Sequence, residues 1–402
     1  MKKAMNVPVI MYHSIGVPNK KWIYNHLTCP YELFESQLHW MKKKNFHTTS
    51  LQDLYNYMNE GMRLPKNPVV LTFDDGYLDN WVFAYPLLKK YESTGTIFVS
   101  PEFVCPEKKC RKTVQDVWAG EIEAKELETT GYLSWGEMKE MIDEKVMDIQ
   151  SHAMTHTLYY KSNKIIDFRH PNDPYLWVTW NNHPNEKPYL QMDRNELIDY
   201  GEPIYEYGNA LNTKRYFSDE NLSKYITTYV AKQDVNDFFK NTNWRDKLSK
   251  IVGDFKKEHM TEEKFETEEE YKKRVQYELQ KSKEVLEEKL DIDVKFLCWP
   301  IGGTSEEALK IASNLGYISS TVARDIDKKT KRSIKNKVGN DPSRIRRIGA
   351  VLYWNKILGE NSNIKYKNGY LMGLSLYQFQ GKLIPNALNK FVFLSQILHG
   401  KV

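Results

Sequence analysis

The chain has little cysteine for its length and almost no excess charge of one sign. Its 402 residues contain four cysteines, Cys29, Cys105, Cys110 and Cys298, which is too few for a fold held by disulfides. Cys105 and Cys110 have the spacing of half a zinc knuckle, but no second pair of Cys or His residues completes it. The 58 basic and 53 acidic residues leave a net charge of +5. This excess is too small for nucleic-acid binding and allows only a mild preference for anionic glycans or phosphate-bearing sugars.

Long hydrophobic runs are also absent. The first apolar run, residues 7–12, is short, contains Pro8 and ends at His13, so we expect neither a secretory signal nor a membrane-spanning helix there. On this basis we expect a cytoplasmic protein without a transmembrane segment, which could act at the inner face of the membrane. Nothing in the sequence indicates the oligomeric state.

The chain does contain enough apolar material for a large core, with 41% hydrophobic and 13% aromatic residues. Short runs rich in β-branched residues alternate with amphipathic helical patterns, such as residues 31–44 and 81–91, which predicts an α/β fold with parallel strands. We expect about seven strands, which suggests a barrel. The predicted strands cover residues 7–12, 69–73, 95–100, 146–150, 294–299, 316–323 and 345–352.

Residues that can carry chemistry stand directly after several of these runs. His13 follows the first run, and Asp74 and Asp75 follow the second. His152 comes after a third run, and His156 follows one turn later. In barrels of parallel strands the reactive groups gather at the carboxyl ends of the strands. We therefore expect these five side chains to lie together at one end of the barrel.

Each of these patterns has a plain structural alternative. His152 and His156 are four residues apart and could share one cation if the backbone turns after the strand, but such spacing also arises by chance. It is not the zincin motif, because Ala153 stands where that motif has Glu. Asp74 and Asp75 could form a turn that caps the following helix. Alternatively, one carboxylate completes a two-histidine, one-carboxylate set for zinc or a similar ion, and the other is a base kept ionised by that cation.

Two runs resemble the first and second motifs of the NodB-like polysaccharide deacetylases, carbohydrate esterase family four. They are TFDDGY at residues 72–77 and SHAMTH at residues 151–156. The resemblance implies a distorted (β/α) barrel with a divalent metal, Zn²⁺ or another such as Co²⁺ or Ni²⁺. It makes Asp75, His152 and His156 the metal ligands. Asp74 would be the general base, and the backbone amide of Tyr77 would help to stabilise the oxyanion.

The first strand resembles that of a subgroup of this family in which the strand ends in Met-Tyr-His. Residues 9–15 are VIMYHSI, and in the subgroup the histidine is the general acid that protonates the leaving amine. The resemblance gives this role to His13. A buried histidine bonded at the rim of the barrel is the alternative.

The third motif departs from the usual pattern of the family. Residues 297–303, LCWPIGG, contain no arginine and have Ile301 where tyrosine is common. We expect Trp299, Pro300 and Arg347 to lie on the substrate side of the site. Some relatives use an arginine near the end of the barrel to steady the base, and Arg347 is the best match, with an ordinary ion pair as the alternative.

The resemblance covers residues 1–156 and 267–352, which we interpret as two parts of one barrel. Residues 157–266 break the alternation of strands and helices and are expected to form a large insertion or cap after the second motif. The aromatic residues of this insertion could stack on sugar rings or form a core of their own. Residues 353–402 are expected to be a C-terminal extension that packs on the barrel.

Together these features predict metal-dependent hydrolysis of the N-acetyl group of an amino sugar, in a polysaccharide or its precursor, with release of acetate. The partner would be an N-acetylated glycan or sugar precursor. Two alternatives stay open: a deacetylase-like barrel that binds glycans without turnover, and a hydrolase of another amide on the same metal site. A metal-free glycosidase is disfavoured, because adjacent aspartates do not flank a glycosidic bond at the roughly 5–9.5 Å separations which that reaction needs.

Overall fold

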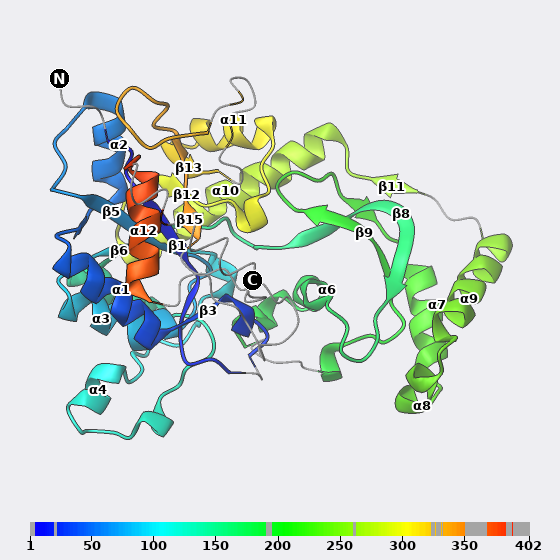
Figure 1. The fold of residues 1–402 in the computed structure, drawn as a ribbon. Helices are drawn as coiled ribbons and strands as arrows, with labels where there is room; N and C mark the ends of the chain where they lie inside the picture. Colours follow the sequence, from blue (N-terminus) through cyan, green and yellow to red (C-terminus); the bar gives the residue numbers. More distant parts are fainter. Residues whose placement is uncertain are drawn as a thin grey trace.

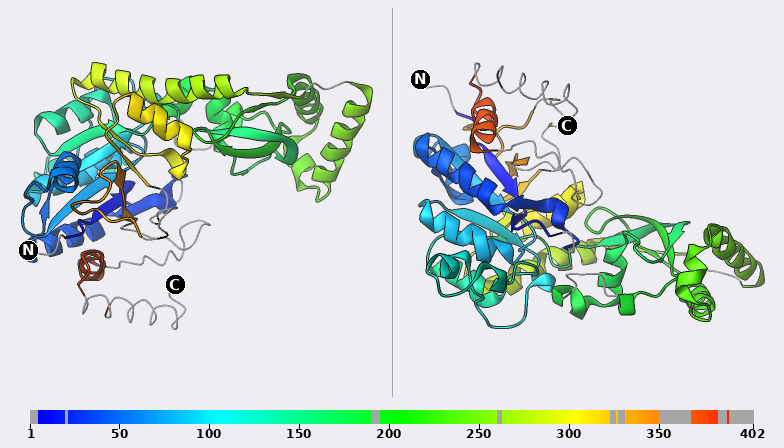
Figure 2. Two further views of the ribbon diagram at one scale, coloured as in Figure 1. Left: turned by 90° about the horizontal axis from the view of Figure 1, so that it is seen from above. Right: turned by 60° about the horizontal axis from the view of Figure 1, so that its bottom comes forward.

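The structure of the protein is a computed structural model. It describes residues 5–19, 22–189, 195–259, 263–322, 333–349 and 368–382, together with residues 326, 331 and 388. Figure 1 shows a barrel of strands wrapped by helices and, to one side of it, an elongated arm. The arm is made of the described residues within 157–266, and it points away from the barrel in both views of Figure 2.

The strands of the barrel, within the described residues, form one nine-stranded sheet in which every pairing is parallel. All seven predicted strands are present, and the seventh is divided in two; residues 323 and 350–352 of the predicted strands lie outside the described part. One short strand, β4 (His47–Thr48), was not predicted and pairs with β5. The others, in order across the sheet, are β14 (Arg344–Ile345), β13 (Ser319–Thr321), β12 (Phe296–Leu297), β7 (Met147–Ser151), β6 (Gly95–Val99), β5 (Pro68–Phe73), β1 (Val9–Tyr12) and β15 (Ile348–Gly349).

The sheet curls into a barrel because its two edge strands are neighbours in the chain. β14 lies at one edge and β15 at the other, yet only Arg346 and Arg347 separate them. Three residue steps span at most about 11 Å, so the two edges must lie side by side. The predicted α/β barrel is therefore confirmed, and the link that brings its edges together carries Arg347.

Alternation along the strands sorts the side chains into two layers. Val70 of β5 belongs to the cluster inside the barrel, whereas its neighbours in the strand pack against the surrounding helices. Because side chains alternate with a period of two, Thr72 and Asp74 continue the inward series. The same rule directs His13 and His152 inward at the ends of β1 and β7. The carboxyl end of the barrel is consequently lined by polar groups above an apolar interior.

The helices that cover the barrel begin at well-formed caps. α2 (Leu51–Glu60), α5 (Trp135–Asp143) and α10 (Glu268–Leu290) each follow a Ser or Thr in a capping box, which satisfies two free amide groups at the helix start. α1 (Tyr31–Lys43) forms as predicted. The helix predicted over residues 81–91 is also present, but its first part, Asn80–Ala84, is π-helical and only Tyr85–Lys90 is the α-helix α3. α11 (Glu306–Asn314) lies between β12 and β13.

One helix of the C-terminal extension is described, α12 (Gly369–Phe379), and it packs on α1. Glycine is required at this contact, because a Cβ atom at Gly373 would lie 2.2 Å from the Trp40 ring and one at Gly369 would lie 2.3 Å from the Ser36 carbonyl oxygen. Most of the extension lies outside the described residues, as does its expected beginning at residue 353.

The arm has apolar clusters of its own. It begins with the antiparallel pair β8 (Leu158–Phe168) and β9 (Pro203–Asn209), with α6 (Leu176–Asn182) between them, and ends with the pair β10 (Tyr216–Phe217) and β11 (Lys264–Phe265). One cluster lies among α7 (Glu220–Ala231), α8 (Val235–Lys240) and α9 (Trp244–Glu258). A second joins the arm to the rim of the barrel and includes Trp177, Trp180, Phe103, Tyr77 and Tyr132. Trp177 and Trp180 are buried in it, as a structural core would require.

Candidate active site

Asp74 is a buried carboxylate held by an arginine. It follows β5, its side chain is only about 4% exposed, and both of its oxygens accept hydrogen bonds from Arg347, at 2.6 Å to Nη1 and 2.8 Å to Nη2. Burial alone would raise the pKa of Asp74, but the guanidinium outweighs it and lowers the pKa below its ordinary value. Arg347 also donates to the Thr72 hydroxyl. The arginine that the sequence placed on the substrate side therefore contacts the proposed base directly.

Asp75 lies between the two histidines of the second motif. Its Oδ1 atom is 3.2 Å from Nε2 of His152 and 3.2 Å from Nε2 of His156. Burial would raise the pKa of Asp75, yet the two imidazoles hold it well below its ordinary value. The three side chains form a compact set whose ligand atoms all lie within 4.8 Å of one another.

The backbone at this set is in an unusual conformation. Asp75, Ala153 and His156 have φ angles of 73°, 59° and 44°, in the left-handed region that costs a residue with a side chain on the order of 1 kcal/mol. Such conformations persist only where surrounding contacts hold them, and they gather at functional sites. Surrounding contacts thus hold these three residues, which turn the ligands toward one another, in a backbone conformation that they do not prefer.

The orientation of His152 is fixed by the end of β12. Its Nδ1 atom lies 2.8 Å from the Cys298 carbonyl oxygen. Because a carbonyl only accepts, Nδ1 must carry a hydrogen, so Nε2, which faces Asp75, is the ring nitrogen that could bind a cation after losing its proton. A histidine oriented in this way can bind a cation through Nε2.

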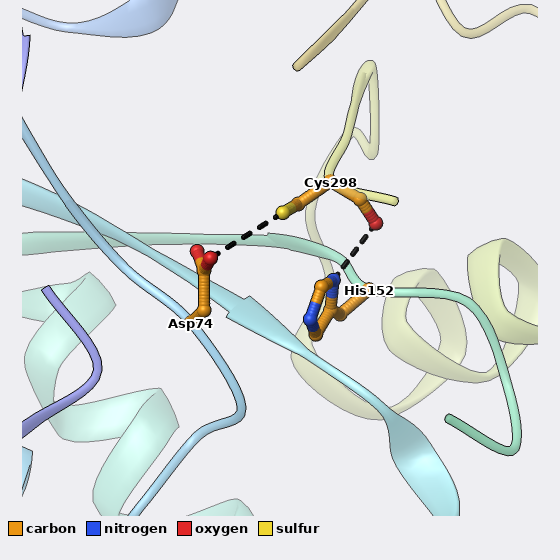
Figure 3. A group of neighbouring side chains, drawn as sticks. All are labelled: Asp74, His152 and Cys298. Atoms are coloured by element: carbon orange, nitrogen blue, oxygen red, sulfur yellow. Dashed lines mark hydrogen bonds between the residues drawn. The ribbon is translucent and has the colours of Figure 1, made fainter. Parts of the chain in front are cut away.

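Cys298 also brings a second potential donor set into the site. Figure 3 shows its thiol beside Asp74, at 3.6 Å, and its carbonyl beside His152. Asp74, His152 and Cys298 are close enough to hold a cation. However, Arg347 already occupies both oxygens of Asp74 and lies 3.1 Å from the Cys298 sulfur, and its charge would repel a metal ion there. We therefore favour the set of Asp75, His152 and His156.

The favoured set fits a divalent cation. Two ligands about 2.1 Å from a zinc-like ion, at angles of about 90–110°, are separated by about 3.0–3.4 Å, and the 3.2 Å distances from Asp75 to both histidines fall within this range. One carboxylate and two imidazoles are also ligands that such ions prefer. The remaining coordination positions would be free for water and substrate.

His13 follows β1, which lies between β5 and β15 in the sheet. Its Nε2 atom is 3.9 Å from Asp74 Oδ2, and its side chain is 24% exposed. The Asn80 side chain donates to the His13 carbonyl oxygen and fixes the end of β1. The imidazole is too far from Asp74 for a hydrogen bond but close enough for charge to be felt, and its exposure allows exchange of protons with solvent.

Tyr77 contributes its side chain as well as its backbone. Tyr77 forms a β-bridge with Tyr132 whose hydrogen bonds are made by the N–H groups of Leu78 and Leu133, so the Tyr77 N–H is outside that ladder. The Tyr77 ring is buried, and burial together with the nearby Asp75 carboxylate raises the pKa of its hydroxyl well above its ordinary value. The sequence resemblance indicated only the amide.

In the third motif, the Ile301 side chain is exposed at the rim of the barrel. Trp299 and Pro300 are both buried, and Asn209 of the arm donates to the Pro300 carbonyl. Ile301 is 66% exposed and has a φ angle of 51°. The role of Trp299 and Pro300 on the substrate side stays a prediction, and Ile301 is the residue of this run that a ligand could reach.

The site combines one carboxylate and two imidazoles with a second carboxylate that an arginine holds. This arrangement, at the carboxyl end of an α/β barrel, is typical of hydrolases. Residues 61–196 match the sequence model of the polysaccharide deacetylase family. This match covers about a third of the chain and includes both motifs, at residues 72–77 and 151–156, so the resemblance that these motifs predict is confirmed.

Individual relatives match over parts of their length. The YxkH protein of Bacillus subtilis, provisionally named a polysaccharide deacetylase, is 34% identical over 98 residues, which are 24% of this chain and 33% of that protein. The poly-β-1,6-N-acetyl-D-glucosamine N-deacetylase of Staphylococcus aureus is 27% identical over 199 residues, 45% of this chain and 60% of that enzyme. The match thus spans less than two thirds of either relative.

Among solved structures, a de-N-acetylase from Aggregatibacter actinomycetemcomitans aligns with a TM-score of 0.49 at 16% identity, over 85% of this chain and 94% of that one. IcaB from Ammonifex degensii aligns with a TM-score of 0.46 at 14% identity, over 86% of this chain and 91% of that one. Within the described residues, no helix is both long enough and apolar enough to cross a membrane.

Proposed function

We propose that the protein is a metal-dependent N-deacetylase that removes the acetyl group from an N-acetylated amino sugar in a polysaccharide or its precursor. The observation that carries this proposal is the position of Asp75, with one oxygen 3.2 Å from the Nε2 atoms of both His152 and His156, next to a base that Arg347 keeps ionised. The name of the S. aureus relative makes a polymer of N-acetylglucosamine the first substrate to test.

Asp75, His152 and His156 would hold the divalent cation, with Zn²⁺, Co²⁺ and Ni²⁺ as the candidates. When bound, such an ion polarises the acetamido carbonyl and makes water more acidic. The hydrogen bond from His152 to the Cys298 carbonyl would keep this ligand in orientation, and the Tyr77 hydroxyl lies near Asp75, a second ligand.

The protein groups supply the proton transfers. Asp74 takes a proton from the attacking water, whose oxygen forms the new bond to the carbonyl carbon. The Tyr77 N–H donates to the oxyanion that results. His13, in its protonated form, gives a proton to the amide nitrogen as the carbon–nitrogen bond breaks. The products are acetate and a free amino sugar. Arg347 holds Asp74 in place by two parallel hydrogen bonds.

The test is acetate release from a panel of N-acetylated sugars and oligosaccharides, including oligomers of β-1,6-linked N-acetylglucosamine. The protein is stripped with a chelator and restored with Zn²⁺, Co²⁺ or Ni²⁺. We expect release to vanish on stripping and to return with metal. Tight metal binding without release on any substrate would instead favour another acyl group or a binding role.

Two substitutions separate the proposed roles. Asp74→Asn should retain the metal and lose most turnover, whereas His152→Ala should lose the metal as well. His47→Ala, which changes an exposed histidine of β4, is the matched control and should affect neither. Equal loss of metal in the Asp74 and His152 variants would contradict this division.

The place of action is also a proposal. We expect a substrate on the cytoplasmic side, such as a lipid-linked or nucleotide-linked precursor of a surface polysaccharide. Fractionation of the native cells tests this, and recovery of the protein outside the membrane would overturn it.

A further inference from the structure

The turn that carries His156 is held by hydrogen bonds between Thr155 and two residues that are distant in the sequence, Glu278 and Lys187. Glu278 of α10 accepts from the Thr155 N–H at 3.0 Å and from its hydroxyl at 2.6 Å. On the other side, the Thr155 carbonyl oxygen accepts a hydrogen bond at 2.9 Å from Nζ of Lys187. One of these holding groups belongs to the barrel, and the other comes from the arm.

Lys187 is unusually placed for a lysine. It lies in the short helix η5 (Pro184–Tyr189) of the arm, and its side chain is only 2% exposed. Besides Thr155, its ammonium contacts the Glu102 carboxylate at 2.5 Å and lies 5.4 Å above the ring of Phe103. Lysine is almost never buried unless it is paired. All three of these partners belong to the barrel.

The hydrogen bond to Thr155 acts directly on the geometry of His156. The Thr155 carbonyl and the His156 N–H belong to one peptide plane, and rotation of that plane changes the φ angle of His156. This angle is 44°, a value that a histidine does not adopt by preference. A bond to the carbonyl oxygen therefore fixes the direction in which the imidazole points.

The His156 ring is also contacted by a residue that Lys187 touches. Phe103 meets His156 edge to face, with ring centroids 6.2 Å apart, and it meets Trp180 of the arm in the same manner at 5.0 Å. The arm thus reaches the histidine by two routes, one through the peptide plane and one through the packing of Phe103.

We propose that Lys187 is a positioning residue through which the arm sets the orientation of His156 and so the affinity of the metal site. This inference rests on the proposed function, since it takes His156 to be a metal ligand. It assigns to the insertion a part in building the active site that the sequence motifs do not contain.

The negative charges near the turn at Thr155 explain why a cationic residue, Lys187, stands at this position. Glu278 accepts from Thr155, and burial together with the nearby Glu102 carboxylate raises the pKa of Glu278. The Lys187 ammonium is within hydrogen-bond distance of Glu102 and lowers the cost of keeping Glu278 charged. A neutral side chain at this position would leave the carboxylates uncompensated and release the Thr155 carbonyl, so the turn could relax toward an ordinary φ angle.

The test compares Lys187→Met with the parent protein in two measurements that do not depend on turnover. One is the Zn²⁺ affinity, measured by competition with a chromophoric chelator. The other is the visible absorption of the Co²⁺-loaded protein, which reports ligand geometry. We expect the variant to bind Zn²⁺ about 10–100-fold more weakly and to show an altered Co²⁺ spectrum. Lys164→Met, which breaks the exposed pair with Glu206 on the same arm, is the matched control and should change neither.

The outcomes separate this inference from the proposed function. If the parent protein binds no metal, the proposed function is wrong. If the parent binds metal and Lys187→Met binds it as tightly with the same Co²⁺ spectrum, only the role of Lys187 is wrong. Should Lys187→Met not fold, Lys187→Gln retains a donor for Thr155 without the charge and should have an intermediate affinity. Failure of both variants to fold would also overturn the proposal, because Lys187 would then serve the fold as a whole.

Discussion

Asp79 makes the stability of the barrel dependent on pH. It precedes the π-helical turn Asn80–Ala84, is 4% exposed and accepts a hydrogen bond from the Ser14 hydroxyl. Burial raises the pKa of Asp79 from 3.8 to about 7, although hydrogen bonds from Ser14 and from the amides of Ile15 and Asn80 oppose the shift. The Cys29 thiol is close enough that Asp79, together with burial, raises the pKa of this thiol. Since these groups are all neutral, the desolvation of the carboxylate prevails.

The expected magnitude follows from this shift. Below pH 4 the carboxyl is protonated in both the folded and the unfolded chain. Between about pH 4 and pH 7 only the folded chain keeps the proton, so the free energy of unfolding falls as the pH rises, by up to about 1.4 kcal/mol per unit. Above pH 7 the loss is complete and amounts to at most about 4 kcal/mol. Asp79→Asn should remove this loss, because the amide does not titrate.

The assay is urea unfolding of the parent and of Asp79→Asn at pH 4.5 and pH 8. The variant should be similar to the parent or slightly less stable at the lower pH, and more stable by a few kcal/mol at the higher pH. Asp254→Asn, at an exposed position of α9, controls for the loss of one negative charge. The reasoning would be refuted if the difference between Asp79→Asn and the parent were the same at both pH values.

Three further substitutions test other contacts of the site. Arg347→Gln leaves the Asp74 carboxylate buried without a cation, and urea unfolding should show a loss of about 3–5 kcal/mol together with the loss of acetate release; full stability would contradict the pairing. Tyr77→Phe removes the hydroxyl beside Asp75, so chelator competition should show roughly tenfold weaker Zn²⁺ binding with little change in Tm. Gly303→Ala would place a Cβ atom 2.0 Å from Cγ of Asn209, so its Tm should fall by several degrees. Gly253→Ala meets nothing within 4 Å and should leave Tm equal or higher.

The sequence was sufficient to locate most strands of the barrel and to predict which reactive residues the fold brings together. Asp74, Asp75, His152 and His156 each follow an apolar run, and the carboxyl ends of parallel strands meet at one end of a barrel. Both signals are local, since a run of β-branched residues and the polar residue after it are neighbours in the chain. Their catalytic roles stay proposals, because position alone does not decide between a ligand, a base and a structural ion pair.

Contacts that depend on distant pairing could not be predicted in the same way. The run from Ile345 reads as one strand, but the structure divides it into β14 and β15, and the link directs Arg347 to Asp74. Cys298 enters the site because β12 pairs with β7. Nothing in the residues around Cys298 or Lys187 distinguishes them from an ordinary core cysteine or a surface lysine.

The position of the insertion in the chain explains why the arm can influence the site at all. The arm leaves the barrel directly after His156, where Asn181 bonds the Thr157 hydroxyl and Lys187 bonds the Thr155 carbonyl. At the other end of its first hairpin, Asn209 bonds the Pro300 carbonyl of the third motif. The arm therefore holds two loops of the barrel rim, both of which adjoin the proposed ligands. Because a strained turn keeps its conformation only while its neighbours hold it, the arm and the proposed metal site have to be regarded as one structural unit, although the residues of both motifs lie in the barrel.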